Sequence, residues 1–266
     1  PNLRHLVILT GTSSEVAGAV SGTLPGAVVR HLPGNPGFGS AANEVLRLVE
    51  GDQGFFLLLH DDVALAPDAV SRLVEELYRS NAGILGPKLL EWDDPRLLES
   101  VGYRADRFGY RVGLAERGEP DQEQHDAVRD VFCLSSACIL IRADLFRSLG
   151  GFETGIEYEG DALDLCWRAH LSGARVMVVP DATARHRAQF AQRRPDLDSG
   201  RDAARQGLLT ALSLSSPIRA ALTLLLAPIV GTVAALAGFA RGSARGGLDA
   251  LRAAGSAFAR IGGVLA

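Results

Sequence analysis

Cysteine is scarce in this sequence and basic patches are missing, and both features exclude classes of protein. The three cysteines, Cys133, Cys138 and Cys166, form an odd set without paired C-x-x-C spacing. We therefore expect neither a structural zinc site nor a disulfide framework, and we expect a reducing compartment such as the cytosol. The net charge is −4 and no basic run is interleaved with aromatic residues, so nucleic acid is not an expected partner.

The length and hydrophobic content are those of a globular enzyme. The chain has 266 residues, 47% of them hydrophobic, which is enough to bury a full core in one or two domains. No signal peptide opens the chain and Pro1 is not an initiator residue, so we expect the chain to be a piece of a longer protein.

One short apolar run ends on two adjacent carboxylates. Residues 55–59 read Phe-Phe-Leu-Leu-Leu and are followed by His60, Asp61 and Asp62. Such a run is typical of a strand buried on both faces, and its end lies at the carboxyl edge of a sheet, where open α/β sheets bind ligands. Neighbouring carboxylates repel one another unless a cation or water offsets their charge, and their oxygens suit Mg²⁺ or Mn²⁺. The alternative is a solvated turn in which Asp61 or Asp62 caps the next helix.

The segments around this run alternate between helix and strand patterns. A Gly-rich loop over residues 34–43 leads into a helical pattern over residues 41–49, and Pro67 suits the first turn of another helix. The order of strand, loop, helix and strand predicts an α/β fold with a mostly parallel sheet flanked by helices.

Several motifs in this order resemble those of the family 2 glycosyltransferases, which have the GT-A fold. The resemblance extends over residues 7–188, and no single motif is specific by itself. The matching segments are Asn35–Gly39 with Asn43, His60–Asp62 with Pro67, Gly86–Leu90, Ser135–Arg142, Gly150–Phe152, Asp161–Arg168, and Val179–Asp181 with His186.

The resemblance implies a transferase that uses a nucleotide sugar and a divalent metal ion, Mn²⁺ or Mg²⁺. By position in the motifs, the implied metal ligands are Asp62, His186 and His60. Asp161, which directly precedes the position of the family's usual base, is the candidate catalytic residue. The implied donor-binding residues are Thr10, Asn35, Gly37, Asn43, His60 and Asp61.

Three features depart from the family pattern. The usual first strand-loop unit is missing, and Thr10 stands where a nucleoside-binding aspartate is expected. His60 replaces the first aspartate of the Asp-x-Asp element, although imidazole can also bind Mn²⁺. Ala162 occupies the position that usually supplies the general base, and alanine cannot accept a proton.

Simpler structural roles are open to several of these residues. Asp164 and Arg168 have the spacing of a surface salt bridge on a helix over residues 161–171, and Asp161 could interact with the dipole of that helix as a first-turn charge. His186 lies between two arginines, which could belong to a solvated loop.

The last sixty residues differ in character from the rest. Residues 220–240 carry no charge, and a helix of that length would span roughly 30 Å. Residues 241–266 have a basic amphipathic pattern, which is typical of membrane surfaces. We therefore predict a transferase domain over residues 1–205 and a helical tail over 206–266 that associates with the cytoplasmic face of the cell membrane through residues 217–266. A buried helix or a hairpin broken at Pro228 is the alternative.

The predicted reaction is inverting transfer of a sugar to a hydroxyl acceptor. A polyprenyl-linked or cell-envelope glycan suits a membrane-associated tail better than a free sugar. Two other functions remain open: a degenerate, non-catalytic domain that binds a glycan or a partner protein, and a nucleotidyltransferase.

Overall fold

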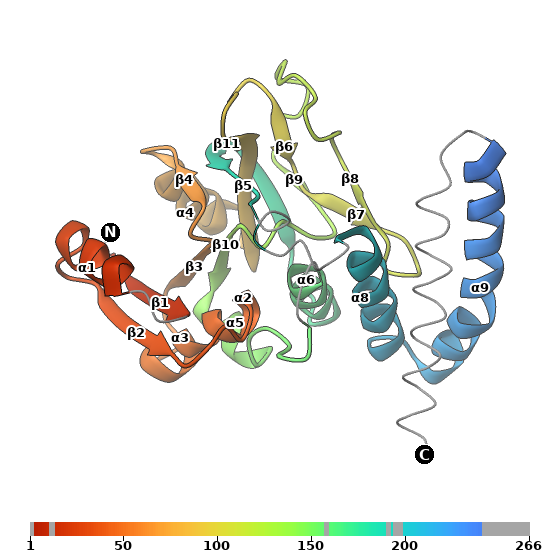
Figure 1. Ribbon diagram of the computed structural model, residues 1–266, viewed down its shortest axis with the longest axis horizontal. Coiled ribbons are helices and arrows are strands. Elements are labelled where there is room, and N and C mark those ends of the chain that lie inside the picture. Colours follow the sequence, from red (N-terminus) through yellow and green to blue (C-terminus); the bar gives the residue numbers. More distant parts are fainter. Residues whose placement is uncertain (1–2, 11–13, 157–159, 190–192, 194–198, 241–266) are drawn as a thin grey trace.

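The computed structural model describes residues 3–10, 14–156, 160–189, 193 and 199–240, and Figure 1 shows their arrangement. A mixed seven-stranded sheet forms the core. Its main path has the order β3–β10–β5–β11–β4, with β6 beside β5 and β9 beside β11. These strands are β3 (Phe55–Leu59), β4 (Val63–Leu65), β5 (Ile84–Glu91), β6 (Leu98–Ser100), β9 (Arg129–Asp130), β10 (Cys138–Arg142) and β11 (Val176–His186).

Two smaller sheets flank this core. β1 (Leu6–Thr10) and β2 (Val28–Leu32) pair in parallel, and β7 (Tyr103–Ala105) and β8 (Arg111–Gly113) form a hairpin. The α/β fold class is confirmed.

The prediction of a mostly parallel sheet is wrong. In the described part of the central sheet, β5 and β11 pair in parallel, whereas β10 runs antiparallel to both β3 and β5. β4 also runs antiparallel to β11. A strand that is buried on both faces is apolar in either orientation, so the hydrophobic pattern of β10 contains no information about its direction.

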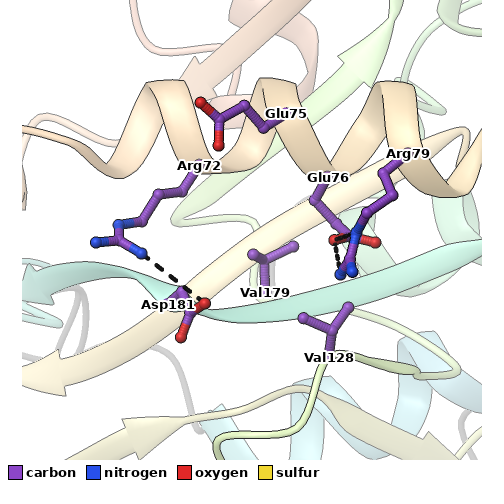
Figure 2. A pocket seen from close by; sticks show the side chains of 7 residues that line it. All are labelled: Arg72, Glu75, Glu76, Arg79, Val128, Val179 and Asp181. Atoms are coloured by element: carbon purple, nitrogen blue, oxygen red, sulfur yellow. Dashed lines mark hydrogen bonds and ion pairs between the residues drawn. The ribbon is translucent and has the colours of Figure 1, made fainter.

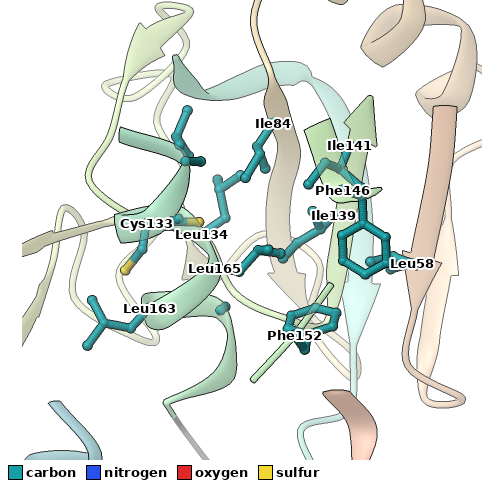
Figure 3. Packing of buried hydrophobic residues seen from close by; sticks show 14 of the residues in the cluster. Leu58, Ile84, Cys133, Leu134, Ile139, Ile141, Phe146, Phe152, Leu163 and Leu165 are labelled. Carbon is teal, nitrogen blue, oxygen red and sulfur yellow. The ribbon is translucent and has the colours of Figure 1, made fainter. Parts of the chain in front are cut away.

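Helices cover both faces of the central sheet. On one face, α4 (Ala69–Ser80) packs Leu73 and Leu77 against Leu85 of β5. On the other face, α5 (Ala143–Ser148) and α6 (Asp161–Leu171) contribute buried side chains to a cluster that also contains Ile84, the neighbour of Leu85 (Figure 3). Successive residues of a strand point to opposite faces, so β5 contributes to both cores. Each fully buried leucine or isoleucine contributes about 1.5–3 kcal/mol to folding.

The loop before β3 contains two short helices. These are α2 (Phe38–Ala42) and α3 (Glu44–Leu48). A further helix, α1 (Ser14–Thr23), connects β1 to β2. Gly37, which precedes α2, has a φ of 88°, a conformation that glycine adopts without strain.

Helix α8 (Ser199–Ser213) packs against α6 and the β7–β8 hairpin. Its Leu208 and Ala211 are buried. The backbones of Gly207 and Gly109 touch, because a Cβ atom on Gly109 would lie 2.0 Å from the Gly207 carbonyl oxygen. The predicted domain boundary between residues 205 and 206 falls inside this helix, and the division into two domains stays a prediction.

Helix α9 (Pro217–Ala240) contains Pro228 and projects beside α8, at the blue end of Figure 1. No helix in the described part of the chain combines the length and hydropathy that a transmembrane span requires. One stripe of α9 is nonetheless exposed and apolar, and consists of Ile218, Leu222, Leu225, Ile229, Val233 and Leu236. The predicted amphipathic helix over residues 241–266 lies outside the described residues.

Candidate metal and donor site

Three of the sequence-predicted residues meet at the ends of the central strands. His60 follows β3, Asp62 precedes β4, and His186 is the last residue of β11. β4 pairs with β11 so that Val63 lies opposite His186, and the backbone N–H of Arg187 donates to the Asp62 carbonyl oxygen at 3.1 Å. One ligand atom from each of His60, Asp62 and His186 lies within 4.8 Å of the other two.

Asp62 and His186 form a buried ion pair. The Oδ1 atom of Asp62 is 3.3 Å from His186 Nε2, and Gln189 N donates to Asp62 Oδ2 at 3.1 Å. Burial favours a raised pKa for Asp62, but the hydrogen bonds with His186 and Gln189 outweigh it and hold that pKa well below its usual range. Burial also opposes protonation of His186, yet the carboxylates of Asp62 and Glu99 raise its pKa to about 9. Without a metal ion, the pair is therefore ionised at neutral pH.

His60 is the third residue of the candidate metal site and lies beside the Asp62–His186 pair. Its ring lies 4.2 Å from the ring of Phe38 and 5.8 Å from that of His186, between centroids. Its Nδ1 atom is 4.0 Å from Asp62 Oδ1, and its buried Nε2 atom has no hydrogen-bond partner among the described residues. Burial is the main cause of a lowered pKa for His60, so its imidazole is neutral, as a metal ligand must be.

The chemistry of this group fits a divalent metal ion. Two imidazoles and one carboxylate converge, and the unpaired Nε2 atom of His60 offers a lone pair or a proton that no described protein group satisfies. Affinity for a site with nitrogen ligands rises along the first-row transition metals from Mn²⁺ onward, whereas Mg²⁺ prefers oxygen ligands and retains its waters. The donor set therefore fits Mn²⁺ better than Mg²⁺.

The Gly-rich loop lies beside this group. Asn35 Oδ1 accepts a hydrogen bond from Gly37 N at 3.0 Å, which closes a turn immediately before Phe38. Because the Phe38 ring contacts His60, the turn formed by Asn35 and Gly37 is next to the candidate metal ligands.

Asn43, another predicted donor-binding residue, has a structural role. Its side-chain amide donates to the Phe152 carbonyl oxygen and accepts from Phe152 N, both at 2.8 Å. Gly151 lies so close that a Cβ atom there would be 2.3 Å from Asn43 Oδ1. These contacts join the Gly-rich loop to the segment before α6, and both hydrogen-bonding ends of the amide are already engaged.

We expect Asn43→Ala to destabilise the protein by about 2–3 kcal/mol, because two hydrogen bonds are lost and the backbone groups of Phe152 lose their partners. Urea unfolding measures this change in the free energy of unfolding. Asn35→Ala is a matched control, since it removes one exposed hydrogen bond and should cost less than about 1 kcal/mol. A cost for Asn43→Ala no greater than that of the control would contradict the structural role.

Two further predicted donor-binding residues, Asp61 and Thr10, are not among the three candidate metal ligands. Asp61 is exposed, and both of its carboxylate oxygens accept from Arg193 Nη1 at 3.0 Å. Thr10 ends β1 in the separate two-stranded sheet, and residues 11–13, which follow it, lie outside the described residues. The structure does not bring Thr10 into contact with the histidines.

Asp161 is the predicted catalytic residue and begins α6. It is buried, and its Oδ1 atom accepts from Ala162 N at 2.7 Å. Its charge is close enough to His60 to oppose in part the lowering of the His60 pKa by burial. Ala162 is also buried, but it belongs to the hydrophobic core. Asp164 forms the expected salt bridge with Arg168, but the Asp164 side chain is buried and the pair does not lie at the surface. The Arg168 guanidinium also donates to the carbonyl oxygens of Leu149 and Gly151.

Glu99 is a site residue that the sequence analysis missed. Its Oε2 atom lies 3.3 Å from His186 Nδ1, on the side of the ring opposite Asp62. Glu99 is in β6, a three-residue strand, and no motif or periodicity in that region identifies it.

A separate pocket lies between α4 and β11, as Figure 2 shows. Its volume of about 240 Å³ is smaller than that of most ligand pockets. Four of its five charged side chains are paired, Arg72 with Asp181 and Arg79 with Glu76. Its lining residues do not include His60, Asp62 or His186, so this pocket is not the candidate donor site.

The fold is similar to that of solved glycosyltransferase structures. A structure of GalNAc-T7 with UDP, GalNAc and Mn²⁺ matches 86% of this chain and 44% of its own chain, with 10% identity and a TM-score of 0.61. A structure of S. aureus TarS, residues 1–349, in complex with UDP matches 86% of this chain and 62% of its own, with 16% identity and a TM-score of 0.50. The chain thus spans less than two thirds of the length of either protein.

No curated protein sequence matches the chain closely enough to count as a relative. The family model described as "Glycosyltransferase like family 2" matches residues 8–212. Since that match covers well over half of the sequence, the chain belongs to the family 2-like glycosyltransferases.

Proposed function

We propose that this protein transfers a sugar from a nucleotide-sugar donor to a hydroxyl group of an acceptor, and that the transfer depends on a divalent metal ion. The observation that carries the proposal is the convergence of His60, Asp62 and His186 at the ends of the central strands of a family 2 domain. The GalNAc-T7 structure, which contains UDP, GalNAc and Mn²⁺, supports the same class of donor and metal.

Each residue of the site has a defined task in this proposal. Asp62, His60 and His186 hold the metal ion, which when bound neutralises the diphosphate leaving group. The turn at Asn35 and Gly37 brings backbone close to the nucleotide. Asp161, buried near His60, accepts the proton of the acceptor hydroxyl as that hydroxyl attacks the anomeric carbon, so the configuration at that carbon inverts.

Mn²⁺ is the proposed metal ion rather than Mg²⁺. Two of the three candidate ligands are imidazoles, which Mg²⁺ binds poorly.

A screen of nucleotide sugars tests this function directly. The full chain is incubated with Mn²⁺ and, one at a time, the UDP-, GDP- and dTDP-linked sugars, and the release of nucleoside diphosphate is measured with and without polyprenyl-phosphate-linked acceptors. Transfer of the sugar with release of a nucleoside diphosphate supports the proposal. Transfer of the nucleotide with release of a sugar 1-phosphate would instead support a nucleotidyltransferase.

The proposed acceptor is a lipid-linked or cell-envelope glycan at the cytoplasmic face of the cell membrane. The support is the exposed apolar stripe of α9, in which Leu225 and Val233 are 66% and 61% exposed. A helix with one exposed apolar face can lie in the membrane surface without crossing it. Residues 241–266 contribute a basic amphipathic pattern in the sequence.

We expect the double substitution Leu225→Asp, Val233→Asp to weaken binding to phosphatidylglycerol-containing liposomes by about a hundredfold. Burial of each side chain in the interface contributes at least about 1.5 kcal/mol, so the loss of two is worth about 3 kcal/mol. Co-sedimentation measures the bound fraction. Leu171→Asp is the control, because this leucine is equally exposed but lies at the end of α6. Equal binding by both variants and the parent would contradict membrane association through α9.

A further inference from the structure

Glu99 is held at the metal site by an irregularity in the sheet. In the pairing of β5 with β6, Leu89 faces Ser100 and Leu90 faces Leu98, so Glu99 is an extra residue with no partner of its own. Such a β-bulge redirects the side chain of the extra residue, and bulges are common next to active sites. β5 lies between β6 and β11, so the side chains of Glu99 and His186 meet across an intervening strand.

The contact between Glu99 and His186 is isolated from water. Both side chains are 9% exposed. Neither Glu99 Oε2 nor His186 Nδ1 has a hydrogen-bond partner among the described residues, although the two atoms are 3.3 Å apart. A buried carboxylate that is not fully hydrogen-bonded is costly, so this arrangement is not explained by folding stability alone.

The two nitrogens of His186 therefore face two different carboxylates. Nε2 faces Asp62 Oδ1 and Nδ1 faces Glu99 Oε2, each at 3.3 Å. We propose that Glu99 is a positioning residue for His186: it holds the proton on Nδ1 and fixes the ring, so that Nε2 is the nitrogen available to a metal ion beside Asp62. A carboxylate on the far nitrogen of a metal-binding histidine orients the ring and makes it a stronger ligand. This inference rests on the metal dependence proposed above.

The test is the affinity for Mn²⁺ alone, measured from the electron paramagnetic resonance signal of the free ion. Glu99→Ala should raise the Kd for Mn²⁺ by about 10- to 100-fold. Glu99→Gln should also raise the Kd measurably, but by less than about tenfold, because a neutral amide oxygen can still accept the Nδ1 proton with about half the strength of a carboxylate. Far-UV circular dichroism and the melting temperature without metal check that each variant is folded.

Glu76→Ala is the matched control. Glu76 is an equally buried glutamate with one ion-pair partner, Arg79, and it lies on α4 outside the site. The control should bind Mn²⁺ like the parent. A packing role for Glu99 would lower the melting temperature without changing the Kd, and that result would overturn the inference. If Glu99→Ala does not fold, Glu99→Gln decides alone, and a Kd equal to that of the parent would overturn it.

Asp62→Asn separates this inference from the proposed function. If the parent binds Mn²⁺ and Asp62→Asn does not, the metal site stands, and the Glu99 variants then report on Glu99 alone. If Asp62→Asn binds as tightly as the parent, the metal site itself is wrong and the role of Glu99 is rejected with it.

Discussion

Substitution of Asp62 by asparagine should abolish the stabilisation that Mn²⁺ and a nucleoside diphosphate give to the folded protein. A ligand at a hundred times its Kd stabilises the native state by about 2.7 kcal/mol, and the loss of one of three metal ligands should reduce this to less than about 0.5 kcal/mol. Sugar transfer should fall with it, by at least about a hundredfold. Thermal unfolding of parent and variant, with and without Mn²⁺ plus UDP, GDP or dTDP, measures the effect.

Asparagine is the better substitution here because Asp62 and His186 form a buried ion pair. Their side chains are 8% and 9% exposed, so alanine at position 62 would leave a cavity and remove the acceptor of Gln189 N, whereas asparagine keeps the size of the side chain and one acceptor oxygen. His125→Ala is a suitable control, since this histidine contacts Glu119 and Arg129 outside the site. Equal stabilisation of Asp62→Asn and the parent by Mn²⁺ and nucleotide would show that Asp62 is not a ligand.

The second large effect concerns the residue that accepts the proton. We expect Asp161→Asn to lower turnover by about 10²- to 10⁴-fold, because a positioned base contributes that factor, or roughly 3–5 kcal/mol of the barrier. The free energy of unfolding should change little, since asparagine can still accept the hydrogen bond from Ala162 N. Sugar transfer per enzyme at saturating donor measures the effect, and Asp144→Asn, which replaces an aspartate in the first turn of α5, is the control.

The variant Ala162→Asp distinguishes two cases: either Asp161 serves as the general base, or the chain has lost the general base that the family carries at position 162. Ala162 packs in the hydrophobic core, and neighbouring side chains on a helix point about 100° apart. An aspartate at position 162 should therefore destabilise the protein and leave turnover no higher than in the parent. A large gain in turnover for Ala162→Asp, with no loss for Asp161→Asn, would mean that the family's usual base has been lost from this chain. It would also support the alternative of a degenerate domain.

The sequence predicts those parts of the fold that depend on local patterns. The bounds of α6 agree with the predicted helix over residues 161–171, because its apolar and charged residues alternate with helical periodicity. β3 likewise coincides with the apolar run before His60. The direction of β10 could not be predicted, because strand direction depends on connections and not on which residues are apolar.

The predicted site agrees only in part with the site in the structure. The motifs place His60, Asp62 and His186 together, although the last two are 124 positions apart, because strand ends of one sheet meet at one edge. Asn43 is different: its amide binds the backbone of Phe152, a contact across 109 positions that no local pattern contains. Glu99 could not be found either, since a bulge in a three-residue strand aims its side chain.

The most direct test of the proposed metal site is an anomalous-scattering measurement on crystals grown with MnCl₂ and a nucleoside diphosphate. Our account predicts one strong manganese peak within about 2.5 Å of Asp62 Oδ1 and of a ring nitrogen of both His60 and His186. Crystals of Asp62→Asn should lack this peak. A manganese peak elsewhere in the parent, with none among these three residues, would contradict the account.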